Sequence, residues 1–536
     1  MRFYHIRILT VLCLAFALLN CANRGSPSGG EEDTEPPVIV RSVPENFSTN
    51  FKADEIRIYF NEYIKIKNVQ KQLIISPPMD PKPDIYPLGG ASKYISIKIN
   101  DTLEANTTYA FNFGQSIVDN NEENPYPYYR YVFSTGNTID SLSVKGYITD
   151  ALKNEPDPFI SVMLYEVDST YSDSIIYKEK PRYITNTLDS VTNFSIDNIK
   201  AGTYKLVALK DENGNYLFDQ RDDKIAFRDG FVTVPTDSNY QLNLFKEQTN
   251  FKAVKPKQES KNKIIFPYEG DYESMRIQVL GETPENYQTR IVKDELRDTL
   301  YYWYKPEFEL DSTQFIVSNE TSVDTFTHRF RNLEADTLTI RAVSSGTLNF
   351  EDEFTLEGSV PFVDIDKSKI KLIDRDSMEI PFKVEYDSTY NRYSFPIEKE
   401  EGQKYFFRML PNTFTDFYEG TNKDTLNYTV RTKQKSEYGN VRVKLRNAKF
   451  PLIVQLVNDK GVVVYERYVT ENPVVDFNNI VAGTYSLRAI FDTNENRKYD
   501  TGNYLLGKKP ERVSYSPPID EVRSNFDQII DFTLLE

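Results

Sequence analysis

The chain has 536 residues, a formal net charge of −16 and only two histidines, His5 and His328. So few histidines exclude a multi-histidine zinc site and leave little basis for Ser-His-Asp or Cys-His catalysis. The acidic balance argues against nucleic acid as a partner, because the phosphate backbone carries the same sign of charge. The length is sufficient for several domains.

The N-terminus has the pattern of a secretion signal. Two arginines precede an apolar run at residues 8–19, which is too short to span a bilayer with normal flanks, and Cys21 follows directly. The pattern resembles a bacterial lipoprotein signal, although Asn20 departs from the small residue usual before the cysteine. The resemblance implies removal of residues 1–20 and lipidation of Cys21, which would anchor the chain to a membrane. An ordinary secretory signal is the alternative.

The residues after the signal predict a tether followed by strands. Residues 21–36 are rich in Gly, Ser, Pro and acidic side chains, as in flexible linkers. Beyond them, apolar and polar residues alternate at period two, for example in "EIRIYF" at residues 55–60 and "VRVKL" at residues 441–445. The many aromatic residues, 37 Tyr and 34 Phe, favour half-buried pleated surfaces. The predicted fold class is all-β, with tandem β-sandwich domains in an elongated chain.

Residues 37–138 carry a first family resemblance. The strings "PPVIVRSVPENFSTNF", "EIRIYFNEYIKIKN", "LEANTTYAFNFGQSIVDNNEEN" and "YVFSTG" occur in this order between Pro36 and Gly136. They resemble the bacterial Ig-like domain of the S-layer type found in many lipoproteins of the Bacteroidota. The resemblance implies a seven-stranded sandwich without catalytic residues. A weaker echo in "VPFVDIDKSKIKL", "EGQKYFFRMLPN" and "YTVRTK" predicts a second Ig-like domain at residues 346–434.

An internal repeat carries a second resemblance. The string "NIKAGTYKLVALKDENGNYLFD" at residues 198–219 returns as "NIVAGTYSLRAIFDTNENRKYD" at residues 479–500, with 12 of 22 positions identical. The first copy and its flanks resemble the transthyretin-like β-sandwich, also seen as carboxypeptidase regulatory-like and collagen-adhesin B-type domains. We therefore expect this module twice, at residues 139–249 and 435–536. Residues 250–345 carry no recognisable motif, and a further β-sandwich is expected there.

Each copy of the repeat places oxygen-bearing side chains at the spacing of a calcium-binding loop. Positions 1, 3, 5, 9 and 12 are occupied by Asp211, Asn213, Asn215, Asp219 and Asp222 in the first copy and by Asp492, Asn494, Asn496, Asp500 and Asn503 in the second. The spacing resembles EF-hand and dockerin loops and predicts structural calcium as the only cofactor, bound more tightly by the first copy with its three carboxylates.

Two features weaken the calcium prediction. The glycine expected at position 6 is Tyr216 in one copy and Arg497 in the other, and strands rather than helices are expected on both sides. The alternative is a plain turn, because Asp and Asn side chains bond their own backbone and tolerate left-handed conformations.

Short motifs of Asp followed by Ser or Thr resemble the O-glycosylation acceptor of periplasmic and surface proteins in the Bacteroidota. They predict modification at Ser141, Ser174, Ser190, Thr299, Thr337 and Thr425. The alternative is that Asp followed by Ser or Thr only starts a strand from a turn.

Aromatic and acidic clusters suggest other functions. Aromatic residues gather at residues 124–133 and 298–308, and the second cluster includes the only tryptophan, Trp303. Exposed rings could bind glycan, but alternation within strands favours a sandwich core with a cross-strand aromatic ladder. Acidic pairs such as Asp364 and Asp366 could suggest a glycosidase, yet among 80 acidic residues solvated faces are the better explanation.

These features together predict a non-enzymatic outer-membrane lipoprotein, anchored by lipid and facing the cell surface rather than the periplasm. Its sandwiches would act as an interaction scaffold for protein partners in the outer membrane, as an accessory subunit of an outer-membrane complex. The alternative is a glycan-binding or adhesin-like surface protein. An enzyme that uses carboxylates alone is the least favoured interpretation, and no nucleic acid is expected as a partner.

Overall fold

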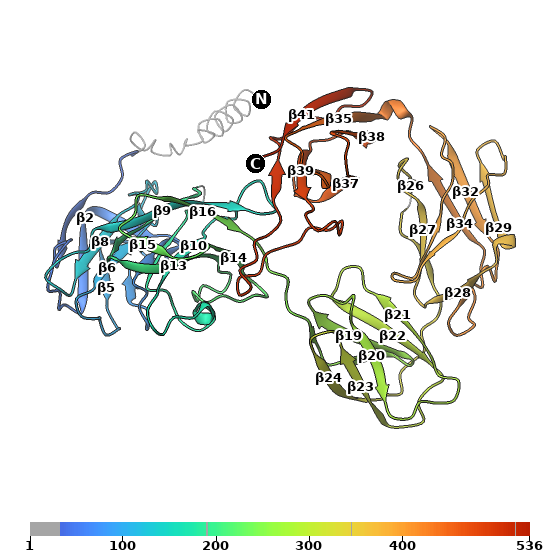
Figure 1. Ribbon diagram of the computed structural model, residues 1–536, viewed down its shortest axis with the longest axis horizontal. Coiled ribbons are helices and arrows are strands. Elements are labelled where there is room, and N and C mark those ends of the chain that lie inside the picture. The colour runs from blue at the N-terminus through green and yellow to red at the C-terminus, as the bar shows by residue number, and fades with distance from the viewer. Residues whose placement is uncertain (1–32, 189–190, 345, 520, 536) are drawn as a thin grey trace, which may run out of the picture. The chain divides into compact units, whose positions relative to one another are not determined.

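The computed structural model describes residues 33–188, 191–344, 346–519 and 521–535, so the predicted signal and Cys21 lie outside the described residues. The regular elements of the described chain are almost all strands, with a four-residue helix, α2 (Val69–Gln72), and short 3-10 turns (Figure 1). The all-β prediction is confirmed. Within the described ranges, no helix is both long and apolar enough to cross a membrane.

The chain forms two compact units. The first contains the residues up to Ser143 together with Arg182–Leu188 and Ile196–Ala201, and the second contains Val144–Pro181, Asp189–Ser195 and Gly202–Glu536. Each unit is held together by its own hydrophobic core residues.

The first unit contains a sandwich of two antiparallel sheets. One sheet has the order β1 (Ile39–Val43), β2 (Glu55–Ile66), β5 (Ser92–Lys98), β4 (Asp84–Tyr86), with β7 (Ile117–Asp119) on the end of β2. The other has the order β3 (Ile74–Ser76), β6 (Thr108–Asn112), β8 (Arg130–Ser134). Alternate residues of β2, such as Ile56 and Ile58, are fully buried and pack with Phe111 and Phe133. Ile184 of β11 (Tyr183–Asn186) donates its backbone N–H to Ser76 Oγ at 3.0 Å.

The second unit contains the second copy of the repeat and most of the first, and their sheets have the same strand order. In the first copy the sheets are β12 (Asn193–Ile199), β9 (Leu142–Asp150), β16 (Asn239–Leu244), and β10 (Ser161–Glu166), β13 (Gly202–Lys210), β14 (Lys224–Phe227), with β15 (Val232–Val234) also on β13. In the second copy they are β38 (Val474–Val481), β35 (Tyr438–Arg446), β41 (Asp527–Thr533), and β37 (Val463–Val469), β36 (Leu452–Val457), β39 (Ser486–Phe491), β40 (Val513–Tyr515).

The two copies also share an unusual parallel pairing. The first strand of each copy pairs in parallel with the last, β9 with β16 and β35 with β41. In this pairing Leu242 lies opposite Ile148, and Ile530 lies opposite Val443. The repetition seen in the sequence therefore extends to strands whose sequences show little likeness.

The segment without a motif folds as two sheets around an aromatic core. One sheet has the order β17 (Lys252–Ala253), β19 (Lys263–Glu269), β22 (Thr299–Lys305), β21 (Gln288–Lys293), with β18 (Lys257–Ser260) on β19. The other has the order β20 (Arg276–Leu280), β23 (Ser312–Ser318), β24 (Val323–Arg329). Phe266, Tyr302 and Phe315 pack edge-to-face between these strands.

The next segment repeats the strand order of the first unit. Its sheets are β25 (Ile340–Ala342), β27 (Phe354–Gly358), β31 (Arg392–Phe395), β30 (Glu385–Asp387), and β26 (Gly346–Thr347), β34 (Leu426–Arg431), β32 (Lys404–Met409), β29 (Ile370–Asp374). A further pair joins β28 (Phe362–Ile365) to β33 (Phe414–Asp416). The orders β25-β27-β31-β30 and β29-β32-β34 correspond to β1-β2-β5-β4 and β3-β6-β8. The strand β25 precedes residue 346, so this sheet begins earlier than the expected Ig-like range.

Candidate functional site

The first repeated loop connects β13 to β14 and is shaped by the carboxylate of Asp211. Asp211 Oδ1 accepts the backbone N–H of Gly214 at 2.7 Å, and Oδ2 accepts that of Tyr216 at 2.7 Å. Asn215 Oδ1 accepts the N–H of Leu217 at 2.8 Å. Tyr216 adopts a φ of 63°, so position 6 has the left-handed backbone that glycine usually supplies.

The second loop is built in the same way around Asp492. This side chain is fully buried, and its two oxygens accept the N–H groups of Asn496 at 3.1 Å and Arg497 at 2.8 Å. Arg497 has a φ of 61°, and Asn496 Oδ1 accepts the N–H of Lys498 at 2.8 Å. Both loops are thus turns in which Asp and Asn oxygens bond the backbone of their own loop, as the turn alternative predicts.

Two carboxylates outside the predicted set close the loops. Asp223 is fully buried and accepts the N–H of Glu212 at 2.9 Å and that of Asp219 at 2.8 Å. In the second loop Glu511 accepts the N–H of Thr493 at 2.8 Å and that of Asp500 at 3.0 Å. Each carboxylate therefore ties the start of its loop to the end.

Sequence reasoning missed these residues for a simple reason. The second loop is longer, so Glu511 does not fall in register with Asp223 when the repeats are aligned without a gap. The signal that could have found them is the strand pairing: Lys210 lies opposite Lys224, while Phe491 donates its backbone N–H to the carbonyl oxygen of Arg512. Asp223 and Glu511 each come directly before the residue, Lys224 or Arg512, at which the chain pairs again with the strand that precedes the loop.

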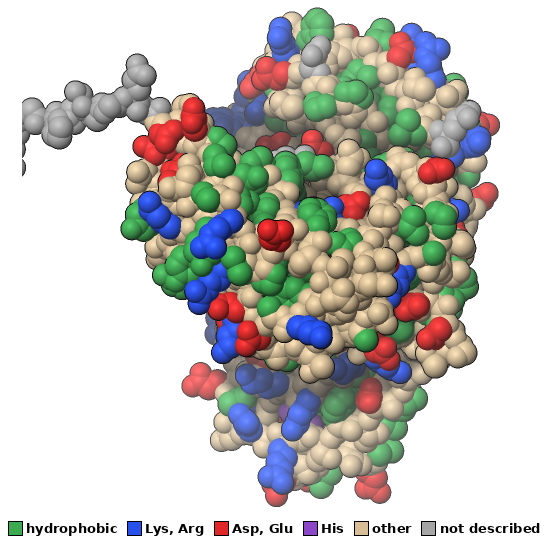
Figure 2. Space-filling model, turned by 90° about the vertical axis from the view of Figure 1, so that its left-hand side faces the viewer, with side chains coloured by type: hydrophobic (Ala, Val, Ile, Leu, Met, Phe, Trp, Pro, Cys, Tyr) green, Lys and Arg blue, Asp and Glu red, His purple; other side chains and the backbone are tan. Residues whose placement is uncertain are grey.

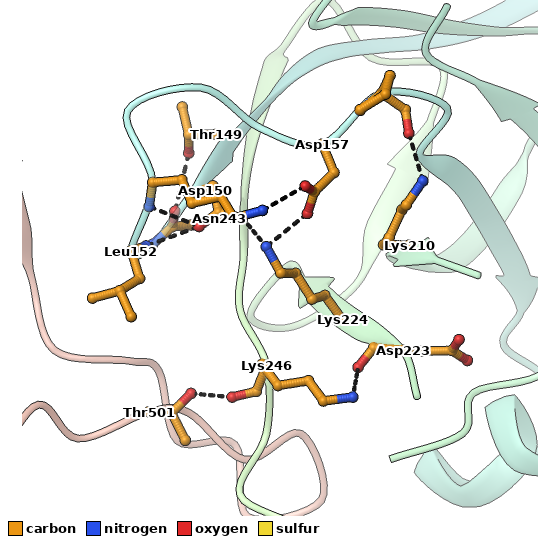
Figure 3. A network of polar contacts seen from close by, with 12 residues as sticks. Thr149, Asp150, Leu152, Asp157, Lys210, Asp223, Lys224, Asn243, Lys246 and Thr501 are labelled. Atoms are coloured by element: carbon orange, nitrogen blue, oxygen red, sulfur yellow. Dashed lines mark hydrogen bonds and ion pairs between the residues drawn. The ribbon is translucent and has the colours of Figure 1, made fainter. Parts of the chain in front are cut away.

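The Asp223 carboxyl is buried, and it accepts hydrogen bonds from two backbone N–H groups of its own loop. Burial raises the pKa of the Asp223 carboxyl above its usual range, although the two backbone N–H groups favour the charged form. Lys246 Nζ donates to the Asp223 carbonyl oxygen at 2.9 Å (Figure 3). Nearby, Lys224 Nζ contacts both Asp150 and Asp157 at 2.7 Å (Figure 3). Although burial opposes the shift, hydrogen bonds from Lys153 and Lys224 lower the pKa of Asp157.

The predicted calcium ligands do not form a carboxylate cluster. Among the described residues, no three His, Cys, Asp or Glu side chains form a group that could hold a metal ion. Asp219, Asp222 and Asn213 are exposed, and Asp219 Oδ1 accepts the N–H of Arg221 at 2.9 Å. In the second copy the amides of Asn494 and Asn496 donate to Asp500, and Asn503 accepts the N–H of Leu506 at 3.0 Å. Calcium binding stays a prediction.

Residues 501–508, in the part of the second loop that is longer than in the first, lie on the first copy of the repeat. Thr501 donates its hydroxyl to the carbonyl oxygen of Lys246 (Figure 3), and Tyr504 donates its N–H to the Glu247 carboxylate. The Tyr504 side chain is 3% exposed and packs edge-on against Phe227. A Cβ on Gly502 would lie 2.7 Å from the Phe245 ring, so only glycine permits this close approach.

Two lysines surround this aromatic contact. Lys509 Nζ lies 3.5 Å from the centre of the Phe227 ring and 3.1 Å from Asp229 Oδ1. Lys205 is 7% exposed, and its Nζ lies 5.5 Å from the same ring centre and 5.7 Å from that of Tyr504. Burial lowers the pKa of both lysines, while cation–π contacts with the rings stabilise their charged forms.

A second contact joins the same two modules. Arg488 is 7% exposed, donates from Nε to Gln455 Oε1 at 2.6 Å, and donates from Nη1 to the carbonyl oxygen of Leu152 at 3.1 Å. The Tyr515 hydroxyl donates to the same carbonyl. Beside these contacts lies a groove of about 1510 Å³, lined by side chains of both charges that include Lys224 and Glu247.

The tryptophan suggested for glycan binding is not on the surface. Trp303 is 3% exposed and packs with Val360 and Phe417, and its ring lies 6.3 Å from that of Tyr418. Lys263 Nζ covers the indole at 4.8 Å from the ring centre. The core interpretation of this aromatic cluster is confirmed for Trp303, and the glycan-binding alternative loses its clearest residue.

The predicted glycosylation positions differ in accessibility. Ser141 and Thr337 are exposed, whereas Ser174, Thr299 and Thr425 are half-buried, and Ser190 lies outside the described residues. Three of the positions sit where strands begin: Ser141 directly before β9, Thr299 at the start of β22, and Thr425 directly before β34. Strand initiation therefore accounts for these three motifs, and modification stays a prediction.

Comparison with known proteins identifies the first domain. Residues 33–135 match the family model described as bacterial Ig-like domain, which confirms the resemblance found in that part of the sequence. The match covers one sandwich and not the whole chain. None of the curated proteins compared matches the chain.

Several solved structures are similar to parts of the chain. Domains 1-6 of the surface layer protein SbsC are 10% identical, with 86% of this chain and 66% of that chain covered and a TM-score of 0.14. The Bacillus anthracis TIE protein is 11% identical, with 95% and 76% covered and a TM-score of 0.13. The I9-I11 tandem from titin is 11% identical, with 53% and 100% covered and a TM-score of 0.13. At these TM-scores the likenesses carry no argument about function.

Proposed function

We propose that the protein is a non-enzymatic lipoprotein of the cell envelope that acts as an interaction scaffold at the outer membrane. The observation that carries the proposal is the bacterial Ig-like domain at residues 33–135, which directly follows the predicted anchor at Cys21. We further propose a second Ig-like domain at residues 346–434 and transthyretin-like modules at residues 139–249 and 435–536, on the strength of their repeated strand orders.

The contacts between modules support a scaffold. A scaffold needs fixed spacing between its binding surfaces, and modules on free linkers would not supply it. Here residues 501–508 bury Tyr504 against Phe227, and Arg488 reaches the backbone of Leu152. Contacts of this kind hold the two copies of the repeat in one arrangement.

The placement of polar groups supports a non-enzymatic role. His328 is 5% exposed and is flanked by the rings of Phe315 and Phe330, so it is not available to a substrate. Asp223 and Glu511 use their carboxylates to bond the backbone of their loops. Buried carboxylates engaged in this way hold structure and are not free to act as general acids or bases.

The anchor and the partner are tested in native membranes. A Cys21→Ser variant should move from the membrane fraction to the soluble fraction, because the acyl acceptor is removed. Retention of the variant in the membrane fraction would contradict the anchor. Affinity purification of the unmodified protein from native membranes should then recover outer-membrane proteins as stoichiometric partners, and recovery of none would contradict the scaffold role.

The orientation needs a separate measurement. Protease added to intact cells should remove the protein if it faces the cell surface, as we propose. A protein that resists protease until the outer membrane is opened would instead face the periplasm. A periplasmic protein used as a marker, which should resist digestion in intact cells, is the control.

A further inference from the structure

The outward face of the β1-β2-β5-β4 sheet in the first unit carries an ordered set of aromatic and basic side chains. Arg41 of β1 lies opposite Tyr59 of β2, and Tyr59 lies opposite Tyr94 of β5. In the neighbouring row, Arg57 lies between Val43 and Ser96. Because strand side chains alternate, these residues point away from the buried face of the same strands.

Direct contacts connect these side chains into one surface. The Arg41 guanidinium lies 4.2 Å from the centre of the Tyr59 ring, and the Tyr59 and Tyr94 rings are 5.8 Å apart. The Tyr86 ring of β4 lies 5.6 Å from that of Tyr94, and Arg57 lies 5.9 Å from the centre of the Tyr94 ring. The rings thus form a ladder across three strands, and basic groups rest on it. We call Arg41, Val43, Arg57, Tyr59, Tyr86 and Tyr94 the aromatic–basic face.

The charge of this face departs from that of the chain as a whole. In the outward rows of these strands the basic side chains are Arg41, Arg57 and Lys98, and the acidic ones are the half-buried Glu55 and the exposed Asp84. Glu55 is already paired with Arg57 at 2.9 Å. In a chain with a net charge of −16, a sheet face with more basic than acidic groups is suited to an anionic partner.

The apolar groups of the same face are also accessible. Val43 is 48% exposed and Tyr86 is 50% exposed, and Val40 at the edge strand is 63% exposed. Figure 2 shows a face of the molecule on which hydrophobic side chains lie beside Lys and Arg side chains. Tyrosine with neighbouring Arg and Lys is the combination found where proteins meet the headgroup region of a membrane.

We propose that the aromatic–basic face docks on the anionic surface of a phospholipid bilayer. The position of the chain end supports this occupant: 18 positions separate Cys21 from Ile39, where β1 begins. A fully extended chain of that length spans about 60 Å at most, so an acyl anchor at Cys21 would keep the face within that distance of the bilayer. This part of the argument rests on the proposed lipid anchor, whereas the charge and the aromatic ladder do not.

The strength of the interaction follows from its electrostatics. Each Arg or Lys near an anionic bilayer strengthens binding about fivefold, and the effect falls off within a Debye length. Arg41 and Arg57 together should therefore account for about 25-fold. Docking on this scale is weak without the anchor and becomes effective when the anchor holds the domain at the surface.

The test uses the full chain with the Cys21→Ser substitution, so that no acyl group contributes. Flotation is measured with phosphatidylcholine vesicles and with vesicles in which one third of the lipid is phosphatidylglycerol. We expect binding to the anionic vesicles, loss of that binding at high salt, and at least about 25-fold weaker binding for Arg41→Glu with Arg57→Glu. Binding to the neutral vesicles measures the contribution that does not depend on lipid charge, which all variants share.

A matched control carries the same charge change elsewhere. Lys371 and Arg408 are exposed neighbours on paired strands of the second unit, and Lys371→Glu with Arg408→Glu should leave vesicle binding unchanged. Equal binding to both kinds of vesicle, or equal losses for the two double variants, would overturn the proposal. So would binding to an acidic polysaccharide with no binding to vesicles. Because Cys21 is absent throughout, these outcomes leave the anchor itself to the membrane fractionation described above.

Discussion

Tyr504 packs edge-on against Phe227, with ring centroids 5.2 Å apart and an interplanar angle of 79°, and this contact joins the two copies of the repeat. Tyr504 belongs to the residues by which the second loop is longer than the first. The repeat is therefore not symmetric: the second copy has gained a segment that binds the first copy.

Replacement of Tyr504 by alanine should remove the ring contact with Phe227 that joins the two copies of the repeat. Removal of a buried aromatic side chain usually costs about 3–5 kcal/mol, and the loss here should appear as undocking of residues 501–508. Limited proteolysis should then cut within this segment, where the unmodified protein resists. Leu506→Ala is the control, because Leu506 is 80% exposed. Equal protease resistance of Tyr504→Ala and the control would contradict the docking.

Replacement of Asp223 by alanine should destabilise the first loop. It would leave the part-buried N–H groups of Glu212 and Asp219 without their acceptor, which costs at most about 1–3 kcal/mol for each group. Chemical denaturation should show the lower stability. Asp222→Ala, at the exposed neighbouring residue, should change the stability by less than about 0.5 kcal/mol. If the two variants are equally stable, Asp223 does not close the loop in the way described.

Acidification should destabilise the middle segment through His328. Burial lowers the pKa of His328 from 6.5 to about 4, with a smaller effect from Arg331. Between these pH values the unfolded chain binds a proton that the folded chain excludes, so stability falls as the pH falls from 6.5 towards 4. The full effect is about 3 kcal/mol.

The measurement is the free energy of unfolding against pH, compared with that of His328→Leu. The variant should keep the slope that comes from carboxylates and lose the part that comes from histidine. A titration of the imidazole signal by nuclear magnetic resonance with a midpoint near 6.5 in the folded protein would contradict this prediction.

Calcium should raise the melting temperature if the repeated loops bind it. Asp219 is exposed and accepts one N–H, whereas Asp211 shapes the turn through three. Asp219→Asn should therefore remove much of the calcium effect and leave the stability in chelator nearly unchanged. Asp211→Asn should lower the stability in both conditions. Identical melting curves in calcium and in chelator would show that the loops are turns alone.

The two repeated loops show how much of the candidate site could be predicted from the sequence. The Asp and Asn residues that make the turns were visible because they bond backbone groups only a few positions away. Glu511 was not visible, since its role depends on the pairing of β39 with β40 and on the length of the loop between them. The docking of Tyr504 depends on a surface formed by residues far away along the chain.

The sequence by itself determined the all-β class, the bacterial Ig-like domain near the N-terminus and the repeat, because alternation, turn residues and short motifs act over a few residues. The tertiary structure decided which polar and aromatic residues are used and where. Trp303 became part of a core rather than a binding surface, and Arg41 came to lie over the ladder of Tyr59 and Tyr94. Burial and contact between distant strands depend on how the sheets assemble, and no local pattern contains that information.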